Sequence, residues 1–189
     1  SSLRRRAQLL SYRPDLIMVP LRGNVHTRLA KLKTMDLDAI VLAAAGIKRM
    51  KLAGNISQPI STKVCLPAIG QGALGLETRI DDDEVNRYLS ILDHEPTRQS
   101  IRAERAFLRR LGGGCQVPIA ALGTVSDDGM LVLRGLVGSL DGRKLIKGMM
   151  EGEAGKALEL GMALAENLLS RGADEILREI YEGEIAREL

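Results

Sequence analysis

The first fifty residues alternate between helical and strand-like spacing of apolar positions. A helix is predicted from residue 1, with Ser1 or Ser2 as its cap and an end at Arg13-Pro14-Asp15. Two apolar runs of strand length follow, and each leads into a helix. The strand runs are residues 16–21 and 38–43, and the helices are about residues 25–33 and around residue 48. Strands that alternate with helices are typical of a parallel α/β sheet.

The second half of the chain has a different pattern. Proline and glycine concentrate in residues 53–80, which indicates a crossing between domains. Two helices are then predicted at residues 81–92 and 95–111. Asp-Gly turns separate the next three apolar runs, which predicts an antiparallel meander followed by two helices. The strands are residues 116–125, 130–138 and 144–150, and the helices are 156–170 and 174–182.

The composition is that of a soluble globular protein, with 45% hydrophobic and 27% charged residues. No apolar stretch approaches the roughly 18 residues of a membrane span, so we expect no membrane association. The two cysteines, Cys65 and Cys115, lie in dissimilar contexts. We therefore expect no disulfide framework and a cytoplasmic location.

Positive charge concentrates at the start of the chain. Residues 1–52 hold eleven Lys/Arg and three Asp, a balance of +8, whereas the remainder has a balance of −5. Such a field suggests an anionic ligand, either nucleic acid or a small acid. A solvated basic face is the simpler interpretation of charge alone. With aromatic residues at only 2%, few side chains could stack on bases, so nucleic-acid binding is not expected.

The position of the basic residues is more informative than their number. They are predicted in the first turns of three successive helices or just before them, where the helix dipole repels cations. The residues are Arg4, Arg5, Arg6, Arg22, Arg28, Lys48 and Arg49. In a parallel α/β sheet these turns share one edge, so a single cleft for carboxylates is predicted. The alternative is that the arginines pair with Asp or Glu from elsewhere in the chain.

Cys115 follows three glycines, which let the backbone adopt unusual shapes and let a bulky group approach. Its thiol could be a nucleophile or an attachment point, although a small buried hydrophobe is the commoner role. Cys65 is predicted to be part of the core. Residues 70–75 match G-x-G-x-x-G but lack the strand and helix of a dinucleotide site. His26 and His94 show no metal-ligand spacing, so no metal is expected.

Several motifs together resemble the porphobilinogen deaminase family. Its second domain is similar to Ser-Ser-Leu-Arg-Arg (1–5), Leu-Arg-Gly-Asn-Val (21–25) and Ala-Gly-Ile-Lys-Arg (45–49). The segment in which the family's chain crosses back from the second domain to the first is similar to Ala-Ile-Gly-Gln-Gly-Ala (68–73). The family's third domain is similar to Gly-Gly-Cys-Gln-Val-Pro (113–118). These motifs span nearly the whole chain in the family's order.

The resemblance implies a transferase of tetrapyrrole (heme) biosynthesis. The family joins four porphobilinogen molecules into hydroxymethylbilane and releases ammonia at each step. Its dipyrromethane cofactor is held by a thioether to a cysteine, which the motif places at Cys115. By the same resemblance Ser2, Arg4 and Arg5 bind the cofactor, and Arg22, Arg28 and Arg49 bind the substrate. These roles reverse the simpler interpretation of Cys115.

The resemblance also implies the fold. Residues 1–66 would be part of a periplasmic-binding-protein-like parallel-sheet domain, and residues 67–93 a crossing and helix of the first domain. Residues 94–189 would be a C-terminal α+β domain with a three-stranded antiparallel sheet that carries the cofactor. The family's first domain, with its catalytic aspartate, has no counterpart here, so no residue of this chain is assigned that role.

We therefore expect the chain to be inactive alone, to need its missing N-terminal segment, and to be a monomer when full length. The alternative hypothesis is a non-catalytic small-anion-binding module of the periplasmic-binding-protein type. That class needs no reactive thiol at Cys115.

Overall fold

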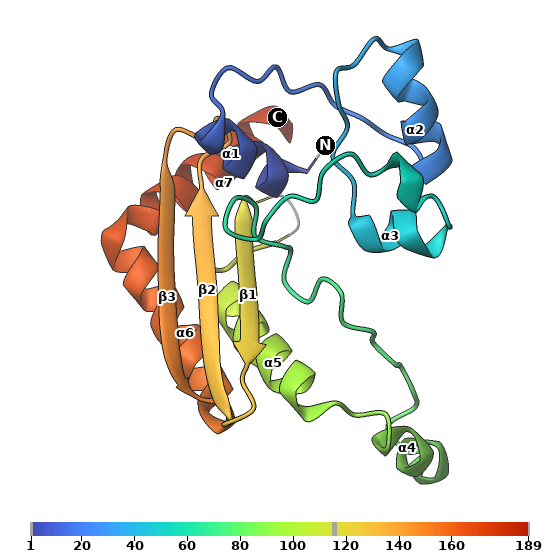
Figure 1. The fold of residues 1–189 in the computed structure, drawn as a ribbon. Coiled ribbons are helices and arrows are strands. Elements are labelled where there is room, and N and C mark those ends of the chain that lie inside the picture. Colours follow the sequence, from blue (N-terminus) through green and yellow to red (C-terminus); the bar gives the residue numbers. More distant parts are fainter. Residues whose placement is uncertain (1, 115–116, 189) are drawn as a thin grey trace.

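The computed structural model describes residues 2–114 and 117–188. These residues form a mixed α/β structure, and a three-stranded sheet is the sheet found among them. In Figure 1 the sheet and the helices behind it form one body, while α2 (Val25–Thr34) and α3 (Ala44–Arg49) lie away from the sheet. Cys115 lies outside the described residues.

The sheet is an antiparallel meander of order β1-β2-β3, as predicted. Its strands are Ile119–Val125, Met130–Gly138 and Leu145–Glu153. The connections turn at Gly129 and Gly142, whose φ angles of +79° and +74° lie in the left-handed region that glycine adopts without strain. The Asp-Gly signals therefore marked both turns correctly.

Helices α5 (Glu95–Arg110) and α6 (Ala157–Leu168) cover one face of the sheet (Figure 1). The core between them and the strands includes Phe107, Leu133 and Leu164, all fully buried. The chain then turns through Gly172, which has a φ of +94°, into the last helix, α7 (Asp174–Glu188). These helices confirm the predicted pattern of the C-terminal half.

The opposite face of the sheet is partly covered from the N-terminal half. Helix α1 (Leu3–Tyr12) places Ala7, which is fully buried, against the β2–β3 turn. A Cβ at Gly142 would lie 2.6 Å from the Ala7 carbonyl oxygen, so glycine is required for this approach. Leu66 joins Ala120 and Leu136 in a small apolar cluster on this face. The two halves of the chain are therefore packed together.

The remaining helices of the first half are short. A 3-10 turn spans Ala53–Asn55, and α4 spans Asp83–Ser90, where Asp82 caps the helix by accepting from the Val85 N–H. None of the helices in the described ranges is long and apolar enough to cross a membrane.

The predicted strands at residues 16–21 and 38–43 are not formed, and this prediction is wrong for the described structure. A strand needs a ladder partner for its N–H and C=O groups, and neither segment has one in the sheet that is present. The apolar side chains are also not buried, since Ile17 is 91% exposed. Apolar spacing identified strand-like segments, but the pairing that would make them strands is absent here.

Gly161 provides a test of the α5–α6 packing. A Cβ at this position would overlap the Ala103 carbonyl oxygen and lie 2.8 Å from the Ala106 Cβ. We expect Gly161→Ala to lower the free energy of unfolding by about 1–3 kcal/mol, because overpacking outweighs the gain in helix propensity. The measurement is urea-induced unfolding followed by circular dichroism.

The matched control is Gly183→Ala in α7, where a Cβ meets nothing within 4 Å. That variant should leave stability unchanged or raise it by up to about 1 kcal/mol. Equal effects of the two substitutions would contradict the close packing of α5 against α6.

Candidate functional site

The N-terminus of α1 presents three of the predicted site residues. Ser2 caps the helix, and its Oγ accepts from the Arg5 N–H at 3.4 Å. Arg4 is half-buried, and its guanidinium donates to the Leu66 carbonyl oxygen at 2.6 Å and to the Gln71 Oε1 at 3.3 Å. Burial lowers the pKa of Arg4. Two of the five guanidinium N–H groups are occupied in this way, and the Cys65 thiol is a further hydrogen-bond partner of Arg4. The guanidinium still has donors left for a ligand.

A buried amide holds this helix in place. Gln8 is 2% exposed, and its Oε1 accepts from the Leu66 N–H at 2.7 Å. Its Nε2 donates to the Leu66 and Arg4 carbonyl oxygens, both at 3.1 Å. The amide thus pairs with both backbone groups of Leu66, as a strand partner would. Sequence reasoning missed Gln8, although a lone amide between Ala7 and Leu9 on an apolar face is a usable signal.

Arg5 connects α1 to the segment before α3. It is half-buried, and its Nη1 donates to the Val41 carbonyl oxygen at 3.2 Å. The Cys65 thiol is half-buried beside Arg4 rather than part of the core. Burial raises the pKa of Cys65, and the nearby charges of Arg4 and Arg5 oppose that shift. The prediction that Cys65 is a core residue is therefore corrected.

Arg22 and Arg28 lie at the turn into α2. Gly23 has a φ of +120°, and a Cβ there would lie 2.8 Å from the Thr27 Cγ2, so the Arg-Gly-Asn sequence suits this turn. Asn24 caps the helix by accepting from the Thr27 N–H at 2.9 Å. The Arg28 Nε donates to the Gly23 carbonyl oxygen at 2.7 Å, and the Arg22 side chain is exposed.

Arg49 does not lie where the sequence predicted. The helix α3 begins at Ala44, so Lys48 and Arg49 occupy its last turn rather than its first. Cations at a helix C-terminus are favoured by the dipole, so these two residues are no evidence for an offsetting anion. The sequence predicted this helix around residue 48, whereas the alanine and glycine residues at 44–46 are already helical.

The structure brings together only part of the predicted site. Hydrogen bonds join Arg4 and Arg5 to segments near residues 41 and 66–71, whereas Arg28 makes a local contact. Among the side chains that the structure describes, those of residues 2–114 and 117–183, no ion pair within 4 Å involves Arg4, Arg5, Arg22, Arg28 or Arg49. The alternative that these arginines pair with Asp or Glu thus finds no support here. A single cleft for all of them stays a prediction.

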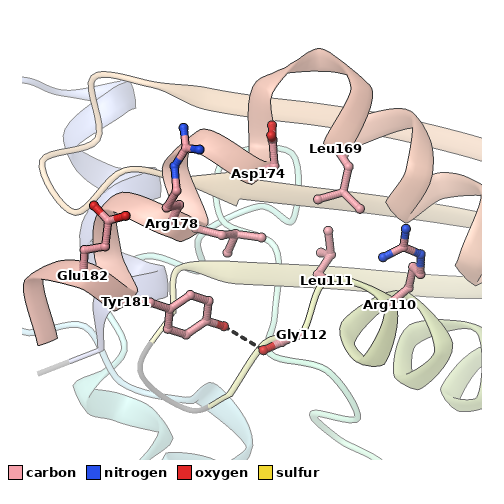
Figure 2. A pocket seen from close by; sticks show the side chains of 9 residues that line it. Arg110, Leu111, Gly112, Leu169, Asp174, Arg178, Tyr181 and Glu182 are labelled. Atoms are coloured by element: carbon pink, nitrogen blue, oxygen red, sulfur yellow. Dashed lines mark hydrogen bonds between the residues drawn. The ribbon is translucent and has the colours of Figure 1, made fainter. Parts of the chain in front are cut away.

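The segment before Cys115 is tightly built, although Cys115 and Gln116 lie outside the described residues. Gly112 has a φ of +63°, and a Cβ at Gly113 would overlap the Ile119 side chain. Tyr181 of α7 donates to the Gly112 carbonyl oxygen at 2.7 Å, as Figure 2 shows. This bond lies beside an open cavity of about 430 Å³ between the end of α5 and α7.

The site also contains a buried carboxylate that the sequence analysis did not single out. Glu104 of α5 is 3% exposed and accepts from the Gly70 N–H at 2.7 Å and the Gly123 N–H at 2.9 Å. Burial raises its pKa, and the two N–H groups oppose that shift. Glu104 therefore joins the 66–71 segment, which holds Arg4, to the sheet. Among the described residues no group of three His, Cys, Asp or Glu could hold a metal ion.

Comparison with known proteins gives consistent matches along the chain. Residues 1–87 match the family model "Porphobilinogen deaminase, dipyromethane cofactor binding domain", and residues 98–170 match "Porphobilinogen deaminase, C-terminal domain". Curated relatives named porphobilinogen deaminase include that of Geobacter metallireducens, 51% identical over the whole chain. Those of Desulforudis audaxviator and Pelotomaculum thermopropionicum are 52% and 54% identical over 97% and 94% of the chain. The chain spans 57–59% of the length of these relatives.

Glu104→Gln tests the buried carboxylate. The pKa of the folded state lies above the ordinary value of 4.5, so the group stabilises the fold most below pH 4.5 and loses this contribution as the pH rises through the folded pKa. Glutamine does not titrate. As the pH rises, the free energy of unfolding of the wild type should therefore fall relative to that of the variant. Urea unfolding at a series of pH values measures it.

At every pH the variant should also lose about 1–3 kcal/mol, because the amide Nε2 cannot accept from the second N–H. The control is Glu159→Gln, whose side chain is exposed on α6. A pH-independent difference between wild type and Glu104→Gln would contradict the role given to burial.

Proposed function

The chain belongs to the porphobilinogen deaminase family, and from this premise we propose that it is part of a hydroxymethylbilane synthase. The complete protein would be a transferase that joins four porphobilinogen molecules into hydroxymethylbilane and releases ammonia at each step. The observation that carries the proposal for this chain is the basic N-terminus of α1. Its arginines have main-chain partners but no carboxylate partner among the described residues.

The residues fit a dipyrromethane cofactor with carboxylate side chains. Arg4 and Arg5 are half-buried, so a carboxylate there would be bound in a medium where charge-assisted hydrogen bonds are strong. The N-terminal N–H groups of α1 add a favourable field for an anion. We propose that Ser2, Arg4 and Arg5 bind the cofactor, and that Cys115 forms the thioether. When bound, the cofactor supplies the pyrrole carbon to which new units are added.

Arg22, Arg28 and Arg49 are proposed to bind the acidic side chains of the substrate. The exposed guanidinium groups of Arg22 and Arg49 are available to solvent, and Arg28 keeps most of its donors after bonding Gly23. The guanidinium fork suits carboxylates because it can donate two parallel hydrogen bonds. These residues hold and orient the substrate, which lowers the entropic cost of the reaction.

The proposed domains are those expected from the resemblance, with boundaries at residues 66 and 93. Large apolar side chains are exposed in the segments assigned to the parallel sheet and to the first domain, including Ile17, Ile80 and Ile91. Apolar surface of this kind marks an interaction site. We propose that the remaining part of a full-length protein covers it and pairs with residues 16–21 and 38–43 to form the periplasmic-binding-protein-like sheet. The full-length protein is proposed to be a cytoplasmic monomer.

The non-catalytic anion-binding module has no independent support. Both family models and all the curated relatives above carry the name of the deaminase. The structure adds nothing that favours a module without a reactive thiol.

Mass spectrometry of the full-length protein tests the cofactor attachment. We expect the peptide that contains Cys115 to carry the added mass of dipyrromethane, because the thioether is covalent and survives digestion. Cys115→Ser should carry no added mass and should not consume porphobilinogen. Cys65→Ser is the matched control and should keep the adduct, and an adduct on Cys65 or an unmodified Cys115 would refute the proposal.

Arg5→Leu in the full-length protein tests the basic site. Loss of a charge-assisted hydrogen bond to a carboxylate should lower the rate of cofactor loading by about tenfold to a hundredfold. Arg6→Leu is the matched control, since Arg6 is exposed on the same helix and carries the same charge. The readout is the fraction of loaded protein against time, and equal losses in the two variants would show a general charge effect instead of a specific site.

A further inference from the structure

We propose that a second cavity, on the open face of the sheet, binds a small organic anion with at least two negative charges on an apolar body. The cavity has a volume of about 330 Å³ and lies between residues 62–66 and the strands β2 and β3. In Figure 1 this face of the sheet is turned toward the viewer, with α5 and α6 behind it. None of the arginines assigned above to the cofactor or the substrate lines this cavity, so the proposal is independent of the proposed function.

Three basic residues line the cavity, namely Lys63, Arg134 and Lys147. Arg134 lies opposite Met149 in the ladder, and Lys147 lies two residues before Met149 on the same face. The two strand cations are therefore diagonal neighbours, roughly 7–8 Å apart. No Asp or Glu is among the lining residues, and no ion pair within 4 Å involves the three cations among the described side chains. Like charges gathered in this way repel each other, and a bound anion would offset the repulsion.

The wall of the cavity from the first half of the chain is held by hydrogen bonds. The Ser61 carbonyl oxygen accepts from the main-chain N–H groups of residues 64 and 65 at 2.9 Å and 3.0 Å. This turn carries Lys63 and Thr62, whose Oγ1 accepts from the Arg134 Nη2 at 3.3 Å. The guanidinium of Arg134 thus reaches from the sheet to the turn, and it keeps further N–H donors for a ligand. The cavity is therefore formed before a ligand arrives, which lowers the entropic cost of binding.

The floor of the cavity is apolar. Leu66 and Leu136 are 8% and 1% exposed and belong to one small cluster, and Gln8 holds the backbone of Leu66 in place. Met149 also lines the cavity and is 63% exposed, although it is a large apolar side chain. Its thioether adapts to apolar surfaces of different shapes. A ligand with an apolar body would cover Met149, whereas inorganic phosphate or sulfate would leave it in water.

The size and the position of the cavity agree with such a ligand. Its volume is at the lower end of the roughly 300–1,000 Å³ found for small-molecule sites. The turn at residues 62–66 belongs to the first half of the chain, and the strands β2 and β3 belong to the second half. A ligand that contacts both walls adds a link between the two halves and stabilises their packed arrangement.

The probe for the test is isophthalate, an aromatic dicarboxylate, which is titrated into the full-length protein and followed by NMR spectroscopy. The amide signals of Gly135, Gly148 and Met149 should shift, with a Kd on the order of 1 mM or lower. Benzoate carries only one carboxylate and inorganic phosphate has no apolar body, so each should bind at least about tenfold more weakly. Equal affinity for benzoate or phosphate, or the absence of shifts in these signals, overturns the proposal.

Variants of the cations locate the bound anion. Arg134→Leu and Lys147→Met should each weaken the binding of isophthalate by about threefold to tenfold, because each removes a charge-assisted contact at a partly exposed position. Lys147 is exposed, so its substitution tests the site even if Arg134→Leu unfolds the protein. The matched control is Arg102→Leu, since Arg102 is exposed on α5, which covers the other face of the sheet.

The control should bind isophthalate with unchanged affinity. An equal loss in Arg102→Leu would show a general charge effect, and unchanged affinity in Lys147→Met would remove the cation from the site, so either result overturns the proposal. Loss of binding in Arg5→Leu would place the probe at the N-terminus of α1 and would also overturn it. The mass of the peptide that contains Cys115 tests the proposed function separately and does not affect this result.

Discussion

The pairing of one buried amide with one backbone residue holds the candidate site together. Gln8 satisfies both the N–H and the C=O of Leu66, in a place where water cannot replace these bonds. An unsatisfied group there would cost about 1–3 kcal/mol, so the register of α1 against residues 66–71 is strongly fixed. Arg4 uses the same Leu66 carbonyl, and its guanidinium is therefore positioned by the same contact.

Glu104 extends this constraint into the C-terminal half. Its two oxygens accept from Gly70 and from Gly123, so one carboxylate joins the segment beside Arg4 to the strand β1. The helix α5 is therefore connected both to the basic site and to the glycine run. Near its middle it holds the basic site through Glu104, and beyond its last residue it leads into the glycine run before Cys115. The proposed cofactor attachment and the proposed carboxylate anchors thus share one rigid element.

The electrostatics of the first fifty residues favour a ligand supplied from outside the described chain. Of its three aspartates, Asp15 pairs with Arg13, which lowers the pKa of Asp15 to about 2. The arginines at the start of α1 and α2 have no such partner among the described residues, although the dipole of each helix opposes their charge. Arg49 shows the limit of this argument. Its helix, α3, begins about four or five residues earlier than the sequence predicted, so Arg49 lies near the C-terminal end of the helix. There the helix dipole favours a cation instead of opposing it.

The sequence by itself determined the elements whose signals are local. The Asp-Gly turns at Gly129 and Gly142, the cap at Ser2 and the amphipathic spacing of α5 all depend on neighbouring residues. The roles of Cys115 and of the arginines come from the motif resemblance and stay predictions. Only the tertiary structure decided which polar groups are buried and which strands have partners. Helical spacing cannot show that Glu104 faces two N–H groups from distant segments, and the apolar run at residues 16–21 cannot become a strand without a second strand to complete its hydrogen bonds.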